Sequence, residues 1–372
     1  MTNFAPIMDK RTFTHRFASG KYALAEYHSL VSPSDPSLAF ERQMNSVLEA
    51  AEEASAGRTV HFRRFFLSDA ANQQLLLEAA LGRLSPAPVS VVQQAPLDGS
   101  RIALWQYATD PMETQDGAPA HNGYRHCWTG SLKAEGKDSL AQTASIFQAL
   151  EGQFARQGLS VARDTVRTWI FMRDVDADYP GMVKGRREYF DSIGLTADTH
   201  YIASTGIEGR TADSRDIVEL DAYAVGGLQE GQMRYLYAPE HLSRTSVYGV
   251  TFERGTSVTY GDRRHVFISG TASIDALGQV MHTGDAGAQA GRMLENVEAL
   301  MAEAGAGLDD IAMAIVYLRD PADFRIVKEK VSAACPEGRI LYVHAPVCRP
   351  SWLVEMECTG MVSAGNPGFR DF

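Results

Sequence analysis

The sequence predicts an α+β protein in which three tandem units, each a mixed sheet with two helices, form an intrachain pseudo-trimer. The 372 residues are enough for two or three domains. The main observation is an internal repeat, because the order of strands and helices near the C-terminus also occurs before it. The two copies share a helix glutamine (Gln142 and Gln289), a strand-ending aspartate (Asp174 and Asp320) and a closing sequence, VELD at 218–221 and VEME at 354–357.

The last unit has the clearest pattern. Residues 265–274, HVFISGTASI, alternate, are rich in β-branched side chains and end in small residues, which predicts a strand that runs into a turn. Over 285–306 the apolar residues fall three and four apart, as in an amphipathic helix. The remaining predictions are a strand at 309–320, a helix at 321–335 that begins with proline, and two strands over 339–362 separated by Pro346 and Pro350.

The two earlier units follow the same order. In the middle unit we predict a strand at 125–132, a helix at 138–159, a strand at 164–174, a helix at 179–190 and closing strands within 200–225. In the first, more degenerate unit we predict a hairpin at 21–31, a helix at 37–56, a strand at 58–69, a helix at 72–84 and a closing strand at 100–108. All three units therefore have the same predicted architecture.

Two segments rich in proline, glycine or aspartate, 109–123 and 226–232, are predicted to be linkers. The predicted domains are therefore residues 15–110, 120–226 and 232–364. A sheet that carries both helices on one face leaves its other face apolar and uncovered. We expect the three sheets to bury these faces against one another around a barrel-like centre.

The composition excludes several classes of function. The net charge of −11 and the pI near 5.4 argue against nonspecific binding to nucleic acid or membranes, which depends on basic patches. Four cysteines without a C-x-x-C pair predict reduced thiols in a cytoplasmic protein. No apolar run is long enough for a membrane span. The histidines lack metal-binding spacing, and no phosphate-binding glycine loop is present, so no cofactor is predicted.

The last unit resembles the RidA/YjgF superfamily. The resemblance is carried by Ser-Gly at the end of the first strand, by a glutamine and LENV in the first helix, and by a strand that ends in a charged pair with aspartate. LVEMEC at 353–358 is similar to the closing VEIE strand of the family. Members of this superfamily are usually homotrimers with clefts between subunits. The resemblance implies that this chain corresponds to such a trimer fused into one polypeptide.

Within that superfamily, residues 165–360 are most similar to the chorismatases, which cleave the enolpyruvyl ether of chorismate and release pyruvate. The matching segments are MVKGR (182–186), QMRYLYAPEHLSRTSVYGVTFERG (232–255), SGTAS (269–273) and VCRPSWLVEME (347–357). By this resemblance, Glu355 is the catalytic acid. Cys348 matches the cysteine of the branch that forms hydroxybenzoate.

Some positions depart from the chorismatase pattern. IDAL follows SGTAS where chorismatases usually have VVGH, and a family tyrosine would fall on Thr245. The deaminases of the superfamily bind the substrate carboxylate with an arginine on the penultimate strand. That position falls on Ile340, and Arg339 matches only after a shift of one residue, which would turn its side chain to the other face of the strand.

The residues themselves also suggest chemistry. Glu355 and Glu357 lie two apart, so both point to one face of a regular strand. Burial of two carboxylates on one face would raise the pKa of one of them, which suits a general acid. The alternative is a structural salt bridge, because the middle unit carries Glu219 and Asp221 at the same places.

The other candidates would bind substrate or assist catalysis. Arg349 could lower the pKa of the Cys348 thiol, although a buried, inert thiol is the more common situation. The candidates for binding substrate carboxylates are Arg254, Arg186, Arg187 and Arg339. Tyr248 could orient the substrate, and Gly270 could allow close approach of the backbone to a ligand.

Three functions therefore remain open: a chorismatase-like enzyme, an imine or enamine deaminase, and a non-catalytic ligand-binding protein. The first unit ends in IALWQYA and lacks the paired acids, so the three clefts cannot be alike. This divergence favours a larger, asymmetric carboxylate substrate. Fusion also removes the usual need to form a trimer, so a monomer or a weak homodimer is expected.

Overall fold

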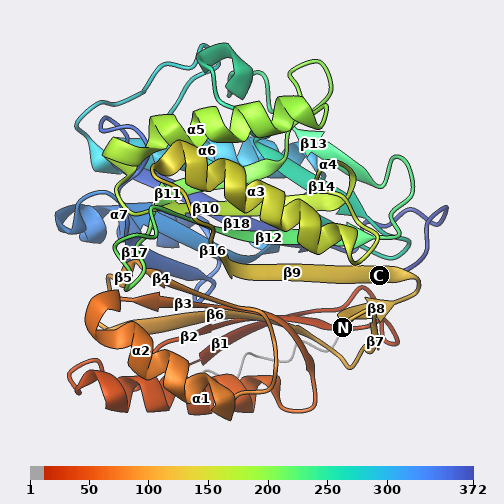
Figure 1. Cartoon of the computed structure of the whole chain (residues 1–372), viewed down its shortest axis with the longest axis horizontal. Coiled ribbons are helices and arrows are strands. Elements are labelled where there is room, and N and C mark those ends of the chain that lie inside the picture. The colour runs from red at the N-terminus through yellow and green to blue at the C-terminus, as the bar shows by residue number, and fades with distance from the viewer. Residues whose placement is uncertain (1–11) are drawn as a thin grey trace.

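The structure of the chain, a computed structural model, describes residues 12–372 (Figure 1). The predicted α+β class is confirmed, because this range contains seven α-helices and three sheets. No helix of this range is long and apolar enough to cross a membrane.

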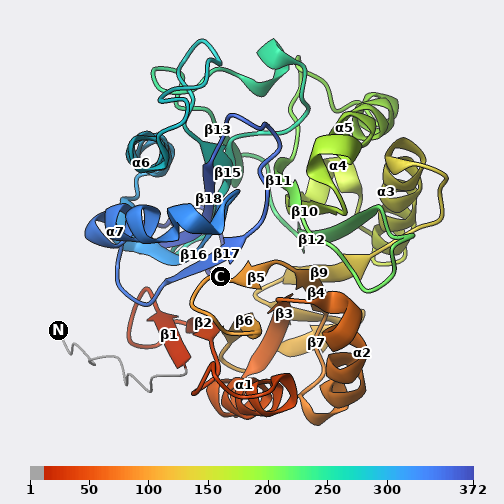
Figure 2. The same cartoon turned by 90° about the vertical axis from the view of Figure 1, so that its left-hand side faces the viewer.

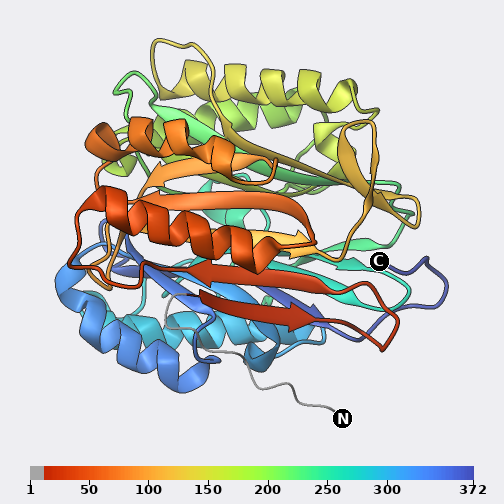
Figure 3. The same ribbon diagram turned by 90° about the horizontal axis from the view of Figure 1, so that it is seen from below.

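The first sheet has the strand order β1-β2-β6-β3-β4. Its strands are β1 (Thr12–Phe17), β2 (Glu26–Val31), β3 (Thr59–Leu67), β4 (Val89–Gln93) and β6 (Ile102–Thr109). The helices of this unit are α1 (Phe40–Ser55) and α2 (Ala70–Ala80), which both lie over the outer face of the sheet (Figure 3). The predicted hairpin at 21–31 is wrong, because β2 pairs with β1, and residues 18–25 form the connection.

The second sheet has the order β11-β10-β12-β9-β8-β7. Its elements are β7 (Glu113–Gln115), β8 (Ala118–His121), β9 (Tyr124–Leu132), α3 (Ser139–Ala155), α4 (Val161–Asp164), β10 (Thr165–Met172), α5 (Val175–Ser192), β11 (Ala203–Glu208) and β12 (Val218–Gly226). Helix α5 begins four residues earlier than predicted, because the Asp174 side chain caps it by accepting from the Ala177 amide at 3.1 Å.

The predicted linker at 109–123 is also partly wrong. Strands β7 and β8 within it form a hairpin that extends the second sheet. The two turn residues, Asp116 and Gly117, both have positive φ angles, of 52° and 79°. An Asp-Gly pair of this kind matches the twist of the flanking strands, and it is a hairpin signal that the sequence contained.

The third sheet has the order β13-β14-β15-β18-β16-β17-β5. Its elements are β13 (Met233–Leu236), β14 (Gly255–Thr259), β15 (Arg264–Ala272), α6 (Ala286–Glu303), β16 (Ile311–Leu318), α7 (Phe324–Ala334), β17 (Ile340–His344) and β18 (Val354–Val362). The two-residue strand β5 (Ala95–Pro96) comes from the first unit and pairs with β17. The sequence did not predict this exchange.

The three sheets share one central pattern. In each, a long closing strand (β6, β12 or β18) runs antiparallel to both neighbours, and the last strand joins in parallel. The register also shifts near the start of β3, β10 and β16 alike, between Val60 and Phe62, Thr165 and Arg167, and Ile311 and Met313. The three sheets therefore share both the order of their central strands and the position of this irregularity.

The helices lie on the outside and the sheets face the centre, as Figure 2 shows. One continuous hydrophobic core includes residues of all three sheets. At its middle, the Trp128 ring lies 6.2 Å from that of Trp105 and 5.9 Å from that of Trp169. The expectation of purely apolar inner faces is wrong, because buried charges such as Arg64 and Asp221 pair there across sheets, 2.8 Å apart.

Candidate active site

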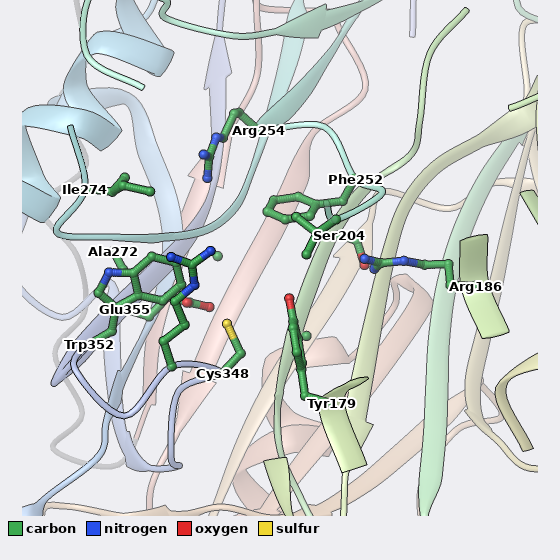
Figure 4. Close-up of a pocket in the computed structure, with 14 residues that line it drawn as sticks. Tyr179, Arg186, Ser204, Phe252, Arg254, Ala272, Ile274, Cys348, Trp352 and Glu355 are labelled. Atoms are coloured by element: carbon green, nitrogen blue, oxygen red, sulfur yellow. The ribbon is translucent and has the colours of Figure 1, made fainter. Parts of the chain in front are cut away.

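A cavity of about 200 Å³ lies between the third and second sheets (Figure 4). Its lining includes a carboxyl group, a thiol, three guanidinium groups and several aromatic rings. The lining residues are Tyr179, Arg186, Ser204, Gly206, Val250, Phe252, Arg254, Gly270, Ala272, Ile274, Cys348, Arg349, Trp352 and Glu355. The structure thus brings together five of the candidate site residues: Glu355, Cys348, Arg254, Arg186 and Gly270.

Glu355 lies on β18, between Ala272 of β15 and Tyr317 of β16. Only 4% of the residue is exposed, although its carboxyl group reaches the cavity. Burial raises the pKa of Glu355 to about 8, and the nearby Glu357 adds to this rise, while Arg254 and Arg167 oppose it. Glu355 is therefore mostly protonated at neutral pH and has a proton to donate.

Gly270 faces Glu355 from β15. A Cβ atom at position 270 would lie only 2.0 Å from the Oε1 atom of Glu355, so no other residue fits there without moving that carboxyl group. The pairing of β15 with β18 shifts register between Ile268 and Thr271, which places Gly270 in an irregular stretch of the strand. The close approach predicted at this glycine is therefore to the side chain of Glu355.

Arg186 projects from α5 on the opposite side of the cavity (Figure 4). The residue is 2% exposed, and its Nε atom donates to Thr251 Oγ1 at 3.0 Å. Within residues 12–372, no carboxylate lies at ion-pairing distance from this guanidinium, and its Nη2 atom has no hydrogen-bond acceptor. Because an unpaired buried cation is unfavourable, the site is suited to an anionic ligand.

Two further guanidiniums reach the cavity from loops. Arg254 is buried, and its Nε and Nη2 atoms donate to the Ser243 carbonyl at 3.2 and 2.9 Å, which fixes its orientation. The guanidinium of Arg349 lies 4.7 Å from the ring centroid of Trp352. Three cations thus surround one mostly protonated carboxyl group, which favours a ligand with more than one carboxylate.

The thiol of Cys348 lies beside Glu355 (Figure 4). Burial raises the pKa of Cys348 to about 12, and Glu355 contributes to the rise, while Tyr179 and Arg349 oppose it. Of the two possibilities left open by the sequence, the buried thiol describes Cys348, because the loss of hydration raises its pKa by more than Arg349 lowers it. Cys348 is a neutral thiol that shapes the cavity.

Arg339 and Arg187 do not line this cavity. The Nη1 atom of Arg339 donates to the backbone carbonyls of Asp309 and Ile311, at 3.1 and 2.7 Å, so this residue braces the start of β16. Tyr248 ends a short 3-10 helix (Thr245–Tyr248), and its side chain lies outside the described part of the chain.

Several lining residues were not predicted. Tyr179 lies seven residues before Arg186 on α5, so both fall on one face of the helix. This spacing could have identified Tyr179 as a neighbour of Arg186 from the sequence. Phe252 and Trp352 come from irregular loops, and an aromatic residue in a loop gives no sequence pattern that separates a cavity wall from a core position.

Glu357 has a different environment from Glu355. Its Oε2 atom lies 2.8 Å from Arg167 Nη2, and its Oε1 atom accepts from Trp169 Nε1 at 2.9 Å. Arg64 Nη1 lies 3.7 Å away, and its guanidinium also pairs with Asp221. The alternative of a structural salt bridge therefore describes Glu357, and Asp221 has the same kind of role.

Glu219 of β12 holds the place in the second sheet that Glu355 holds in the third. Its carboxyl group is already occupied, because Ser131 Oγ donates to Oε1 at 2.6 Å and Lys133 Nζ lies 3.5 Å from Oε2. Ser131 lies in the irregular stretch of β9 that corresponds to Gly270 in β15. In the first sheet, Ala103 of β6 holds the position that corresponds to Glu355. Of these three positions, Glu355 is the one that lines the cavity described above.

Comparison with known proteins gives a consistent family. A family model described as Endoribonuclease L-PSP matches residues 256–362. The 3-aminoacrylate deaminase RutC of Acinetobacter baylyi is 31% identical over 93 residues, which is 24% of this chain and 74% of that protein. A RutC family protein of Pyrococcus abyssi is 35% identical over 94 residues, 25% of this chain and 74% of that protein.

Two matches extend over more of the chain. The 3-hydroxybenzoate synthase of Streptomyces hygroscopicus is 29% identical over 266 residues, 64% of this chain and 74% of that protein. A crystal structure of a chorismatase matches with a TM-score of 0.65 and 18% identity, over 92% of this chain and 100% of that one, and so shows a shared fold. From the curated relatives and the family model together, the chain belongs to the RidA/YjgF family.

Proposed function

We propose that this protein cleaves the enolpyruvyl ether of chorismate and releases pyruvate. The similarity to a 3-hydroxybenzoate synthase and to a chorismatase indicates an enzyme of the chorismatase type. One observation supports this specific reaction: the mostly protonated Glu355 shares a cavity with Arg186. Within residues 12–372, Arg186 is a buried cation without a carboxylate partner.

Chorismate has two carboxylates on opposite parts of the molecule. One would form a bidentate pair with Arg186, and the other would lie near Arg254 and Arg349. The rings of Phe252 and Trp352 would contact the apolar faces of the cyclohexadiene. This arrangement places the ether between the two anchored ends, where Glu355 can reach it.

The chemistry begins with transfer of the Glu355 proton to the terminal methylene carbon of the enol ether. The methylene becomes a methyl group, and the adjacent carbon becomes an oxocarbenium ion. Water adds to that carbon and returns a proton to the Glu355 carboxylate. The hemiketal then breaks its bond to the ring oxygen: its hydroxyl group becomes the carbonyl of pyruvate, and the hydroxyl proton goes to the departing ring oxygen, so chorismate and water give pyruvate and a dihydroxycyclohexadiene carboxylate.

A second product route is possible from the same cation, if the neighbouring ring hydroxyl captures it in place of water. The captured hydroxyl gives up its proton to the Glu355 carboxylate and a cyclic ketal forms. One ring C–O bond of the ketal then breaks and its oxygen leaves as the carbonyl oxygen of pyruvate, while the ring loses a proton and becomes aromatic and the remaining ring oxygen gains a proton. The products are pyruvate and a hydroxybenzoate, and no water is consumed overall. The neutral Cys348 thiol beside Glu355 would favour this route by keeping water away from the cation. The deaminase alternative receives less support, because Arg339 lies outside the cavity and braces the start of β16.

The tandem organisation is part of the proposal. We infer three domains, 15–110, 120–226 and 232–364, arranged as a pseudo-trimer within one chain, from the strand order that their sheets share. With Glu219 occupied by Ser131 and Lys133, one cleft per chain would be active. Because all three contacts between units form within the chain, the protein would act as a monomer or weak homodimer.

The test is incubation of the full chain with chorismate in D₂O. Pyruvate is followed with lactate dehydrogenase, and its methyl group is analysed by NMR. We expect pyruvate with one deuterium in the methyl group and loss of turnover in Glu355→Gln. Glu219→Gln is the matched control and should retain activity. Turnover in Glu355→Gln equal to that of the wild type, or pyruvate release no faster than the spontaneous rate, would contradict the proposal.

A further inference from the structure

We propose that Glu357 is a positioning residue for Glu355: two arginines bind its carboxyl group, and through Thr205 it fixes the Gly270 backbone against the Glu355 carboxyl group. The catalytic consequence rests on the proposed function, whereas the structural relation does not. Glu357, the second acidic residue of VEME, thus has a role although the reaction itself does not use it.

The first step is the ion pairing of Glu357. The residue is 3% exposed, and its carboxyl group lies 2.8 Å from Arg167 Nη2 and 3.7 Å from Arg64 Nη1, and accepts from Trp169 Nε1 at 2.9 Å. Arg167 and Trp169 belong to the second sheet and Arg64 to the first, so the third sheet alone could not hold this anion. Two guanidiniums from two other sheets therefore face this one carboxylate.

The second step is the hydroxyl group of Thr205 on β11. It donates to Glu357 Oε2, and it accepts from Arg167 and, at 2.9 Å, from the Gly270 amide. The single proton and both lone pairs of this hydroxyl are therefore used, which leaves it one orientation. Thr205 thus ties Glu357 to the backbone of β15.

The third step is the contact between Gly270 and Glu355. The Oε1 atom of Glu355 lies where a Cβ atom of residue 270 would be, 2.0 Å from that position. Movement of the Gly270 backbone would therefore either displace the carboxyl group or open space for water beside it. Because Glu357 and Thr205 fix Gly270, they control both the position of the Glu355 carboxyl group and the exclusion of water from it.

The fixed charge acts on Glu355 as well. Both glutamates point to the same face of β18, so the anion of Glu357 disfavours a second negative charge. Arg254 and Arg167 act in the opposite direction. The ionisable groups near Glu355 on the surrounding elements are Glu357, Arg167, Tyr317, Arg254, Cys348, Arg349, Tyr179 and Arg186.

Asp221 provides a matched control within the same ion network. It pairs with Arg64 at 2.8 Å and accepts from the Ser131 amide at 2.8 Å, whereas Glu357 is bonded to Thr205. Asp221→Asn therefore removes a buried anion from the network without removing the link to Gly270. The Asp221→Asn variant therefore shows how much the titration of Glu355 changes when the network loses a charge but Glu357 keeps its bond to Thr205.

The experiment measures the protonation of Glu355 in the full chain without substrate. Infrared difference spectra locate the carboxylic acid band that is missing in Glu355→Gln, and its intensity is followed against pH. We expect Glu357→Gln to lower the titration midpoint by about one pH unit or more. Glu357→Asp should largely restore it, and Asp221→Asn should shift it much less.

Thr205→Val tests the positioning step with every charge in place. Water admitted beside a loosened Gly270 should lower the midpoint of Glu355, and Thr205→Ser should restore it. Should Glu357→Gln fail to fold by circular dichroism, Thr205→Val decides alone. An unchanged midpoint in Thr205→Val, or an equal shift in Asp221→Asn and Glu357→Gln, overturns the inference.

These outcomes are independent of the proposed reaction. A shifted midpoint in a protein that releases no pyruvate would leave the inference intact and contradict the proposed function. If pyruvate is released, the loss of kcat/KM at alkaline pH should begin at lower pH in Glu357→Gln than in the wild type. Pyruvate release with an unaltered midpoint would support the function and reject the role of Glu357.

Discussion

The Oε1 atom of Glu355 fills the space that a side chain on Gly270 would need, because a Cβ atom there would lie 2.0 Å away. The acid and the glycine come from adjacent antiparallel strands of one sheet, β18 and β15. The glycine therefore permits a carboxyl group to lie against bare backbone.

Gly270→Ala should displace that carboxyl group. We expect kcat for pyruvate release to fall about 10- to 100-fold, because a shift of about 1 Å at a catalytic group has an effect of this size. KM should change little, since Arg186 and Arg254 are left in place. Gly291→Ala on α6 is the control, because its Cβ would meet no atom within 4 Å and alanine favours the helix. Full activity in Gly270→Ala would contradict the close contact.

Arg186→Met should separate binding from stability. Replacement of a buried cation that has no carboxylate partner in residues 12–372 with an apolar side chain should raise the thermal midpoint of the ligand-free protein. The same change should weaken substrate binding by about 2 kcal/mol, since it removes a charged hydrogen-bond donor. Differential scanning fluorimetry and KM for chorismate measure the two effects. The exposed neighbour Arg187, changed to Met, should alter neither by a comparable amount.

The activity should depend on pH through Glu355. The reaction needs the protonated carboxyl group, which loses its proton as the pH rises through about 8. We expect kcat/KM to decrease roughly tenfold per pH unit above that value. A profile measured from pH 6 to 10, with the fold checked by circular dichroism at each end, tests this expectation. Activity that increases up to pH 10 would rule out Glu355 as the acid.

The buried histidines should make the fold sensitive to acid. Burial lowers the pKa of His28 and of His61 to about 3 in the folded chain, whereas a histidine in an unfolded chain titrates near 6.5. Between these values the unfolded state binds more protons, so each histidine lowers the free energy of unfolding as the pH falls. The raised pKa values of Glu355 and Glu219 have the opposite effect, but only above about pH 4.5.

Urea unfolding at several pH values between 6.5 and 4.5 measures this balance. We expect stability to decrease toward pH 4.5, and His61→Phe should flatten the dependence. The exposed His282, changed to Asn, should leave the slope as in the wild type. A slope that does not differ between His61→Phe and His282→Asn would show that His61 does not contribute.

The order of helices and strands could be predicted because it depends on local periodicity and on the repeat. The wrong predictions concern segments whose structure depends on which strands pair with each other. β1 and β2 are joined by residues 18–25, and β7 and β8 are too short to show alternation. β5 forms only because β17 of another unit lies beside it.

The candidate site could be predicted in part for the same reason. Gly270, Cys348 and Glu355 lie in segments whose sequence resembles that of a known family, and the structure places them around one cavity. The role of Glu357 could not be predicted, because its partners Arg64 and Arg167 come from two other sheets. The pKa of Cys348 depends on burial, which outweighs the arginine beside it in the sequence.

The pairing of β5 with β17 has a consequence for synthesis of the chain. Pro96 lies opposite Val343, and the Leu97 amide donates to the Tyr342 carbonyl at 3.0 Å. When the first unit leaves the ribosome, the strand that β5 joins has not yet been translated. This edge of the third sheet is therefore completed only after residues 340–344 have emerged, and until then β5 has no strand to pair with.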